Sequence, residues 1–67
     1  MEQKVWKNNL KSLRIERGYS QQQVADLLGL KSHNRICRWE KGQLVPHIKN
    51  LIKLSYVYQV PVQDILS

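Results

Sequence analysis

Apolar side chains recur three and four residues apart along most of the chain, which is the spacing of one face of an α-helix. Glycine and proline separate these stretches, and no stretch alternates apolar and polar residues for long enough to indicate a strand. We therefore predict an all-α fold, in which residues 1–67 form a single domain of five helices. The predicted helices span residues 5–17, 21–28, 32–41, 48–58 and 62–66.

Two of these helices have a distinct apolar stripe. In the first helix the stripe consists of Trp6, Leu10 and Leu13. In the fourth helix, which starts at residue 47 or 48, the buried face is expected to contain Ile48, Leu51, Leu54, Ser55 and Tyr58. Leu51 and Leu54 should meet the apolar residues of the second and third helices, so the predicted core lies between these elements.

The stretch from Ser20 to Gly42 is predicted to be two short helices joined by a tight turn. Ser20 followed three residues later by Gln23 matches a capping box, which starts a helix. Gly29 is placed to end that helix in the left-handed conformation that glycine adopts without steric penalty. Ser32 is expected to cap the next helix, and Gly42 to end it.

The second helix of this pair separates its side chains onto two sides. Ile36, Trp39 and Glu40 fall on one side, and Trp39 is expected to pack in or beside the core. The opposite side and its flanks carry polar and basic residues: His33, Asn34, Arg35, Cys37, Arg38 and Lys41. Amide and guanidinium groups can form paired hydrogen bonds with adenine or guanine edges, and cations can bind phosphate, so this side is suited to nucleic acid.

The charge balance supports the same partner. Lysine and arginine number 11 against 5 acidic residues, which gives a formal net charge of +6. This excess favours a polyanion, with nucleic acid first and an anionic membrane surface second, although basic residues can also simply keep a small domain soluble. No apolar run approaches the roughly 20 residues of a membrane span, and residues 1–10 lack the apolar stretch of a signal peptide. Cys37 is the only cysteine, so a reducing cytoplasm is expected.

Together these residues resemble the helix-turn-helix of the Cro and phage-repressor type transcriptional regulators, the XRE family. The resemblance is carried by Ser20, Gln21, Val24, Ala25, Leu28, Gly29, Ile36 and Arg38–Gly42, and continues through Pro46, Leu51, Leu54, Val60 and Ile65. It covers nearly the whole chain from Leu10 and implies a compact, five-helix, lambda-repressor-like DNA-binding domain. The turn at Leu30–Ser32 is one residue longer than is usual in the family, which bears on the register of the recognition helix.

The resemblance implies sequence-specific binding of double-stranded DNA by a transcriptional regulator, with the recognition helix, residues 32–41, in the major groove. The predicted base-contacting residues are Asn34, Arg35, Arg38 and His33. The predicted phosphate-contacting residues are Gln21, Lys31, Ser32, Lys41 and Gln43. In this family the positions of Arg14 and Glu40 often form a salt bridge, so we expect this pair to be structural.

Homodimer formation is predicted from apolar residues that lie outside the predicted core. Dimers of helix-turn-helix domains address half-sites roughly 34 Å apart. The candidate dimer surface consists of Ile52, Tyr56, Val57 and Leu66. We expect a monomer or weak homodimer that pairs on a palindromic site, and repression or activation to depend on where that site lies.

Other functions are less favoured by the sequence. An enzyme is not expected, because the chain has no cluster of carboxylates, no glycine-rich phosphate loop and no Ser/His/Asp arrangement. His33 and His47 are far apart, with no further ligand at suitable spacing, so no metal, cofactor or small-molecule effector is expected. RNA binding would favour exposed aromatic residues on a sheet. The alternative that stays open is a protein-interaction module, such as an antitoxin or adaptor domain.

Overall fold

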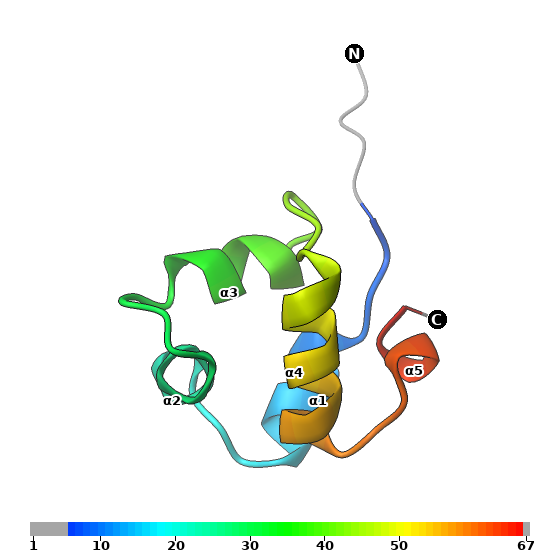
Figure 1. Cartoon of the computed structure of the whole chain (residues 1–67), viewed down its shortest axis with the longest axis horizontal. Coiled ribbons are helices and arrows are strands. Elements are labelled where there is room, and N and C mark those ends of the chain that lie inside the picture. Colours follow the sequence, from blue (N-terminus) through cyan, green and yellow to red (C-terminus); the bar gives the residue numbers. More distant parts are fainter. Residues whose placement is uncertain (1–5, 67) are drawn as a thin grey trace.

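Helices make up most of the structure. The computed structural model describes residues 6–66, so the predicted helix start at Val5 lies outside the described residues. The helices are α1 (Leu10–Glu16), α2 (Gln21–Leu28), α3 (Asn34–Glu40), α4 (Ile48–Tyr58) and α5 (Val62–Leu66) (Figure 1). The described part of the chain contains no strand, which confirms the all-α prediction. Within these residues, no helix has the length and apolar character that crossing a membrane requires.

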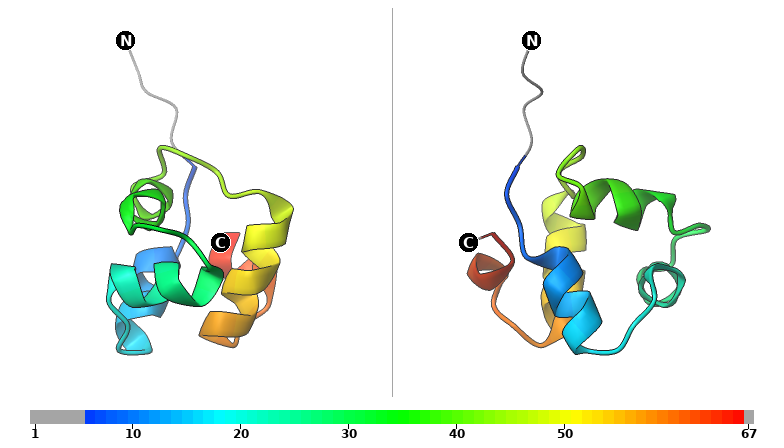
Figure 2. Two further views of the ribbon diagram at one scale, coloured as in Figure 1. Left: turned by 60° about the vertical axis from the view of Figure 1, so that its left-hand side comes forward. Right: turned by 180° about the vertical axis from the view of Figure 1, so that it is seen from behind.

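The longest helix, α4, lies at the centre of the arrangement. It packs against α2 on one side and against α5 on the other, while α1 lies behind it and contacts α3 (Figure 1). Seen from the opposite side, α1 comes to the front and α3 extends across one end of the molecule (Figure 2). The pair α2 and α3 packs together as the predicted helix-turn-helix, and α4 packs against α2.

A single apolar core joins all five helices. Trp39 and Tyr58 are its largest fully buried side chains. The buried apolar residues are Leu10, Val24, Ala25, Leu28, Ile36, Trp39, Leu51, Leu54, Tyr58 and Ile65. The predicted contributions of Leu28, Ile36, Leu51 and Leu54 to the core are therefore confirmed, as is the core position of Trp39.

The predicted start and end of α2 are confirmed in detail. The Ser20 hydroxyl accepts a hydrogen bond from the Gln23 backbone N–H at 3.0 Å, and the Gln23 side-chain oxygen accepts from the Ser20 N–H at 2.7 Å. This reciprocal pair satisfies two N–H groups that a helix start leaves without partners. Gly29 ends the helix with φ of 78°, and the next N–H, of Leu30, donates to the Ala25 carbonyl at 2.8 Å.

The first helix starts five residues later than predicted. The prediction of a helix from residue 5 is wrong for residues 6–9, which are not helical, and α1 begins at Leu10. The Asn8 side-chain oxygen accepts from the Leu10 N–H at 3.0 Å, and the Asn9 N–H donates to the Ile65 carbonyl at 2.8 Å. Asparagine competes with the helical hydrogen-bond pattern in this way, and here tertiary partners decide the outcome.

Two further expectations are corrected. The helix α3 begins at Asn34 with His33 at its N-cap, so Ser32 lies outside the helix, although its hydroxyl accepts weakly from the Asn34 N–H at 3.4 Å. Ile48 was expected in the core but is 55% exposed, because it is the first residue of α4 and lies at the edge of the apolar stripe. The N-cap of α4 is His47, whose Nδ1 accepts from the Lys49 N–H at 3.1 Å.

Candidate nucleic-acid interface

The helix α3 is held by its buried face and presents its opposite face to solvent. Ile36 and Trp39 are each 1% exposed and anchor the helix in the core. Since these residues are three positions apart, they fall on one face of the helix, and Asn34, Arg35 and Arg38 lie on the exposed side. The exposed residues include all four predicted base-contacting residues, His33, Asn34, Arg35 and Arg38.

A hydrogen-bond network ties α3 to α1 and α2 through Glu40. The Arg14 guanidinium donates to both Glu40 carboxylate oxygens, from Nε at 2.6 Å and from Nη2 at 3.2 Å. Its Nη1 donates to the Tyr19 carbonyl at 3.0 Å. The Arg14 and Glu40 side chains are only 13% and 3% exposed. The hydrogen bonds that Arg14 donates to Glu40 raise the pKa of Arg14, against the opposing effect of partial burial. The pair thus has the structural position expected from the sequence.

Gln21, a predicted phosphate-contacting residue, belongs to the same network. Its side-chain amide donates to Glu40 Oε1 at 3.1 Å, and the residue is half-buried. The amide is therefore engaged within the protein. Gln21 is nevertheless the first residue of α2, where free backbone N–H groups create a positive potential that favours an anion.

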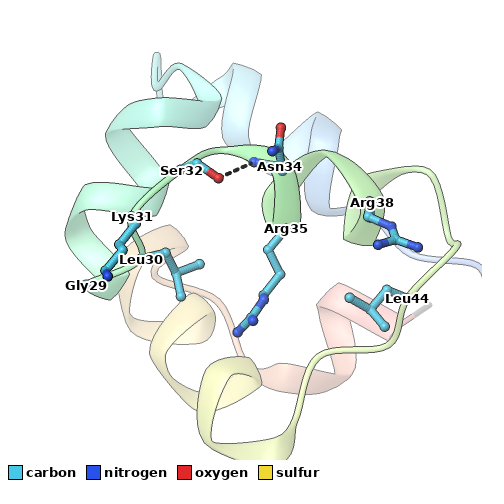
Figure 3. Close-up of a pocket in the computed structure, with 8 residues that line it drawn as sticks. All are labelled: Gly29, Leu30, Lys31, Ser32, Asn34, Arg35, Arg38 and Leu44. Carbon is cyan, nitrogen blue, oxygen red and sulfur yellow. Dashed lines mark hydrogen bonds between the residues drawn. The ribbon is translucent and has the colours of Figure 1, made fainter.

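A shallow hollow of about 510 Å³ lies between α3 and the turns on either side of it. Its lining consists of Gly29, Leu30, Lys31, Ser32, Asn34, Arg35, Arg38 and Leu44 (Figure 3). Three of these residues are cations and none is acidic, so the hollow has a positive potential. Five of the nine predicted DNA-contacting residues are thereby brought to one surface: Lys31, Ser32, Asn34, Arg35 and Arg38.

Within this hollow the side chains of α3 point in different directions. Arg35 extends into the hollow, whereas the Asn34 side chain points away from Arg35 (Figure 3). The guanidinium of Arg38 is at the same end of the hollow as the Leu44 side chain (Figure 3). Asn34 and Arg38 are four residues apart and share one face of the helix, while Arg35 lies on its flank.

The remaining predicted residues lie outside the hollow. His33, Lys41 and Gln43 are exposed. The backbone N–H of Gln43 donates to the Arg38 carbonyl at 3.0 Å, so only the Gln43 side chain is open to a ligand. Among the described residues, no three His, Cys, Asp or Glu side chains gather closely enough to hold a metal ion.

Sequence reasoning missed the residues that support α3 from outside the helix-turn-helix. Trp6 and Asn8 donate side-chain hydrogen bonds to the carbonyls of Leu44 and Trp39, at 2.8 and 3.0 Å. The partners in these two pairs are 38 and 31 positions apart, a separation that leaves no periodic signal in the sequence. The adjacent asparagines at positions 8 and 9 were the available hint, since asparagine favours helix starts over helix interiors.

Comparison with known proteins identifies the fold family. The profile of the helix-turn-helix family matches residues 10–65, which is most of the chain. The chain belongs to this family. The match extends well beyond α2 and α3 and includes the supporting helices α1, α4 and α5. Membership in this family of DNA-binding transcriptional regulators, of the Cro and phage-repressor type, agrees with the prediction that the chain is not an enzyme.

Two curated relatives are named as transcriptional regulators of phage or prophage origin. The cryptic phage CTXphi transcriptional repressor RstR of Vibrio cholerae is 30% identical over 63 residues, covering 94% of this chain and 56% of RstR. The SPbeta prophage-derived HTH-type transcriptional regulator YonR of Bacillus subtilis is 39% identical over 58 residues, covering 87% of this chain and 53% of YonR. This chain therefore spans about half the length of these two relatives.

Solved structures share the same helix arrangement. A protein from Bacteroides fragilis superimposes with a TM-score of 0.79 at 24% identity, over 87% of this chain and 92% of the other. The transcription factor NHTF from Neisseria superimposes with a TM-score of 0.76 at 22% identity, over 88% of this chain and 67% of the other. At these identities the likeness demonstrates the fold, and the site must be argued from the residues of this chain.

Proposed function

We propose that this domain binds double-stranded DNA sequence-specifically as the reading part of a transcriptional repressor. The observation that carries the proposal is the exposed face of α3 and its preceding turn. Every exposed charged side chain from Lys31 to Lys41 is a cation, and the one carboxylate in that range, Glu40, is nearly buried and paired. A helix of about 10 Å diameter fits the major groove, which is about 12 Å wide.

The proposed division of roles follows from where each side chain lies. Asn34 and Arg38 share the outward face of α3, so they reach the groove floor together and read base edges. His33 precedes them at the N-cap and contacts a base edge at the start of the helix. Arg35 lies on the flank and reads a base only if the longer Leu30–Ser32 turn rotates the helix toward it.

Phosphate contacts are proposed on both sides of the reading face. Lys31 and Ser32 precede α3, Lys41 and Gln43 follow it, and Gln21 starts α2. Residues placed in this way bind the two sugar–phosphate backbones that border the groove, and they fix the register of the protein without reading sequence. We also propose that the protein acts on DNA in the cytoplasm.

Repression and pairing are proposed from the relatives and from the exposed apolar surface. RstR is a phage repressor, and repressors of this type bind paired half-sites. Ile52, Tyr56 and Leu66 are exposed, with Tyr56 79% accessible, whereas Val57 is half-buried against the core. Three of the four predicted residues are thus free to form a small dimer surface. We propose a weak homodimer that pairs on a palindromic site.

Selection of bound duplexes from a random DNA pool tests the proposal. The expected result is an enriched palindromic sequence bound at least about a thousandfold more tightly than a scrambled duplex. Its affinity should fall steeply as salt rises, because cation–phosphate contacts release counterions. A protein-interaction module, such as an antitoxin or adaptor domain, would enrich no sequence, and that result would refute the proposed function.

A further inference from the structure

Residues 6–9 form a non-helical segment that leads into α1 (Figure 1) and bonds to the C-terminal end of the recognition helix and the turn after it. The backbone N–H of Trp6 donates to the Gly42 carbonyl at 3.2 Å, and its indole Nε1–H donates to the Leu44 carbonyl at 2.8 Å. The Asn8 side-chain amide donates to the Trp39 carbonyl at 3.0 Å. All three acceptors belong to the end of α3 or to the turn that follows it.

These bonds reach the C-terminal end of α3 and the turn that follows it. The helix has seven residues, about two turns. A helix end leaves backbone carbonyls without helical partners, and donors from elsewhere can hold them. The local turn satisfies some of them, since Gly42 N–H donates to the Trp39 carbonyl at 3.0 Å. The segment adds donors that also fix where the helix end lies relative to the rest of the domain.

The segment is itself anchored at its other end. The Asn9 N–H donates to the Ile65 carbonyl at 2.8 Å, and the Asn9 side-chain amide donates to the Asp64 carbonyl at 2.7 Å. Asn8 Oδ1 accepts from the first N–H of α1, of Leu10, at 3.0 Å. Residues 6–9 therefore join α5 and the start of α1 to the end of the recognition helix (Figure 2).

We infer that Trp6 and Asn8 are positioning residues for base reading, an inference that rests on the proposed function. Asn8 binds the carbonyl of Trp39, the residue that follows Arg38, the proposed base-contacting residue. Trp6 binds the carbonyl of Leu44, whose side chain is at the same end of the hollow as Arg38. Paired hydrogen bonds to a base edge need a well-fixed donor, whereas a flexible cation on a phosphate tolerates small shifts. Loosening the segment should therefore weaken specific binding and leave nonspecific binding unchanged.

Trp6→Phe tests this inference, because it keeps an aromatic ring against the core and removes the indole N–H donor. Affinity for the selected duplex should fall by about three- to tenfold, while affinity for the scrambled duplex and the salt dependence stay unchanged. The melting temperature should fall by only a few degrees, since the lost bond is solvent-exposed. Asn8→Ser provides a second test, because its hydroxyl can still accept from the Leu10 N–H but is too short to replace the bond to Trp39.

Lys7→Gln is the matched control. Lys7 lies between the two positioning residues and its side chain is exposed, so its replacement should leave the ratio of specific to nonspecific affinity unchanged. If both Trp6→Phe and Asn8→Ser retain the parent's ratio, the inference is overturned while DNA binding stands. Equal losses on both duplexes together with a reduced salt slope would show direct phosphate contact, and would also overturn it. A parent protein that prefers no duplex would refute the proposed function itself.

Discussion

Replacing Glu40 with glutamine should destabilise the domain far more than its small change in shape suggests. The carboxylate accepts two hydrogen bonds from Arg14 and one from Gln21, and it joins three helices. Glutamine has nearly the same volume but no charge, and its amide NH₂ group would face one of these donors. Arg14, only 13% exposed, would then be left as a poorly compensated cation.

The magnitude follows from the burial of the pair. Removing one partner of a buried ion pair typically costs about 3–5 kcal/mol. The residual exposure of Arg14 allows water to compensate in part, so we expect about 3 kcal/mol. A domain of 67 residues has a total stability of roughly 3–10 kcal/mol, so this loss is a large fraction of it. Replacing both partners, as Arg14→Met with Glu40→Gln, should recover about 1 kcal/mol or more relative to Glu40→Gln alone, because no buried charge remains.

Urea unfolding followed by the fluorescence of buried Trp39 measures these differences. With an m-value near 1 kcal/mol/M, the Glu40→Gln midpoint should fall by about 2–3 M. Glu16→Gln is the matched control, since Glu16 is an exposed carboxylate in α1 and its loss should cost less than about 0.5 kcal/mol. A Glu40→Gln protein as stable as the Glu16→Gln protein would refute the reasoning, as would a double-mutant cycle with no coupling between positions 14 and 40.

Three further predictions concern the core, the pH dependence and the DNA contacts. Leu54→Ala should lower the free energy of unfolding, measured in urea, by about 2–5 kcal/mol. Ile52→Ala, on the exposed side of α4, should lower it by less than about 1 kcal/mol. Equal losses in the two variants would contradict the placement of α4. Burial, with a smaller contribution from Glu40, raises the pKa of Tyr58 above its ordinary value of 10.0. The unfolded chain therefore loses this proton first, and stability should fall as the pH rises above about 10. Tyr58→Phe should lose less stability than the parent between about pH 8 and pH 11, and parallel pH profiles would contradict this assignment. Arg38→Ala should weaken binding to the selected duplex by about 1–3 kcal/mol and relax the preference at one base position. Lys41→Ala should weaken binding to all duplexes alike and reduce the slope of log affinity against log salt by about one. Fluorescence anisotropy titrations at several salt concentrations distinguish these two outcomes.

Local signals in the sequence account for most of the fold. The capping box at Ser20, the left-handed glycine at position 29 and the proline before α5 each act within a few residues. Apolar periodicity likewise predicted that Leu51 and Leu54 lie in the core. Apolar residues three and four positions apart share one face of a helix, and that face packs against the rest of the protein. The exposed basic face of α3 was predicted by the same reasoning, as the complement of its buried face.

The parts that sequence did not predict depend on contacts between distant residues. The later start of α1 results from bonds of Asn8 and Asn9 to Trp39, Asp64 and Ile65, which lie more than 30 positions away. Periodicity predicted Ile48 in the buried face of the fourth helix, but it could not show that the packing leaves this side chain 55% exposed. Similarly, the directions of Arg35 and Arg38 depend on where the end of α3 is held. That position depends on residues outside the helix-turn-helix.

The anchoring of residues 6–9 on α5 also bears on how the domain is made during translation. Asn9 and its partner Asp64 are separated by 55 positions, so this contact can form only when nearly the whole described chain has left the ribosome. Until then the segment that holds the end of α3 has no fixed anchor, and the core lacks Ile65, which is fully buried. A nascent chain that has completed α3 therefore carries its basic side chains without a fixed geometry. The proposed capacity to select a DNA sequence is then acquired last, when residues 6–9 and α5 come together.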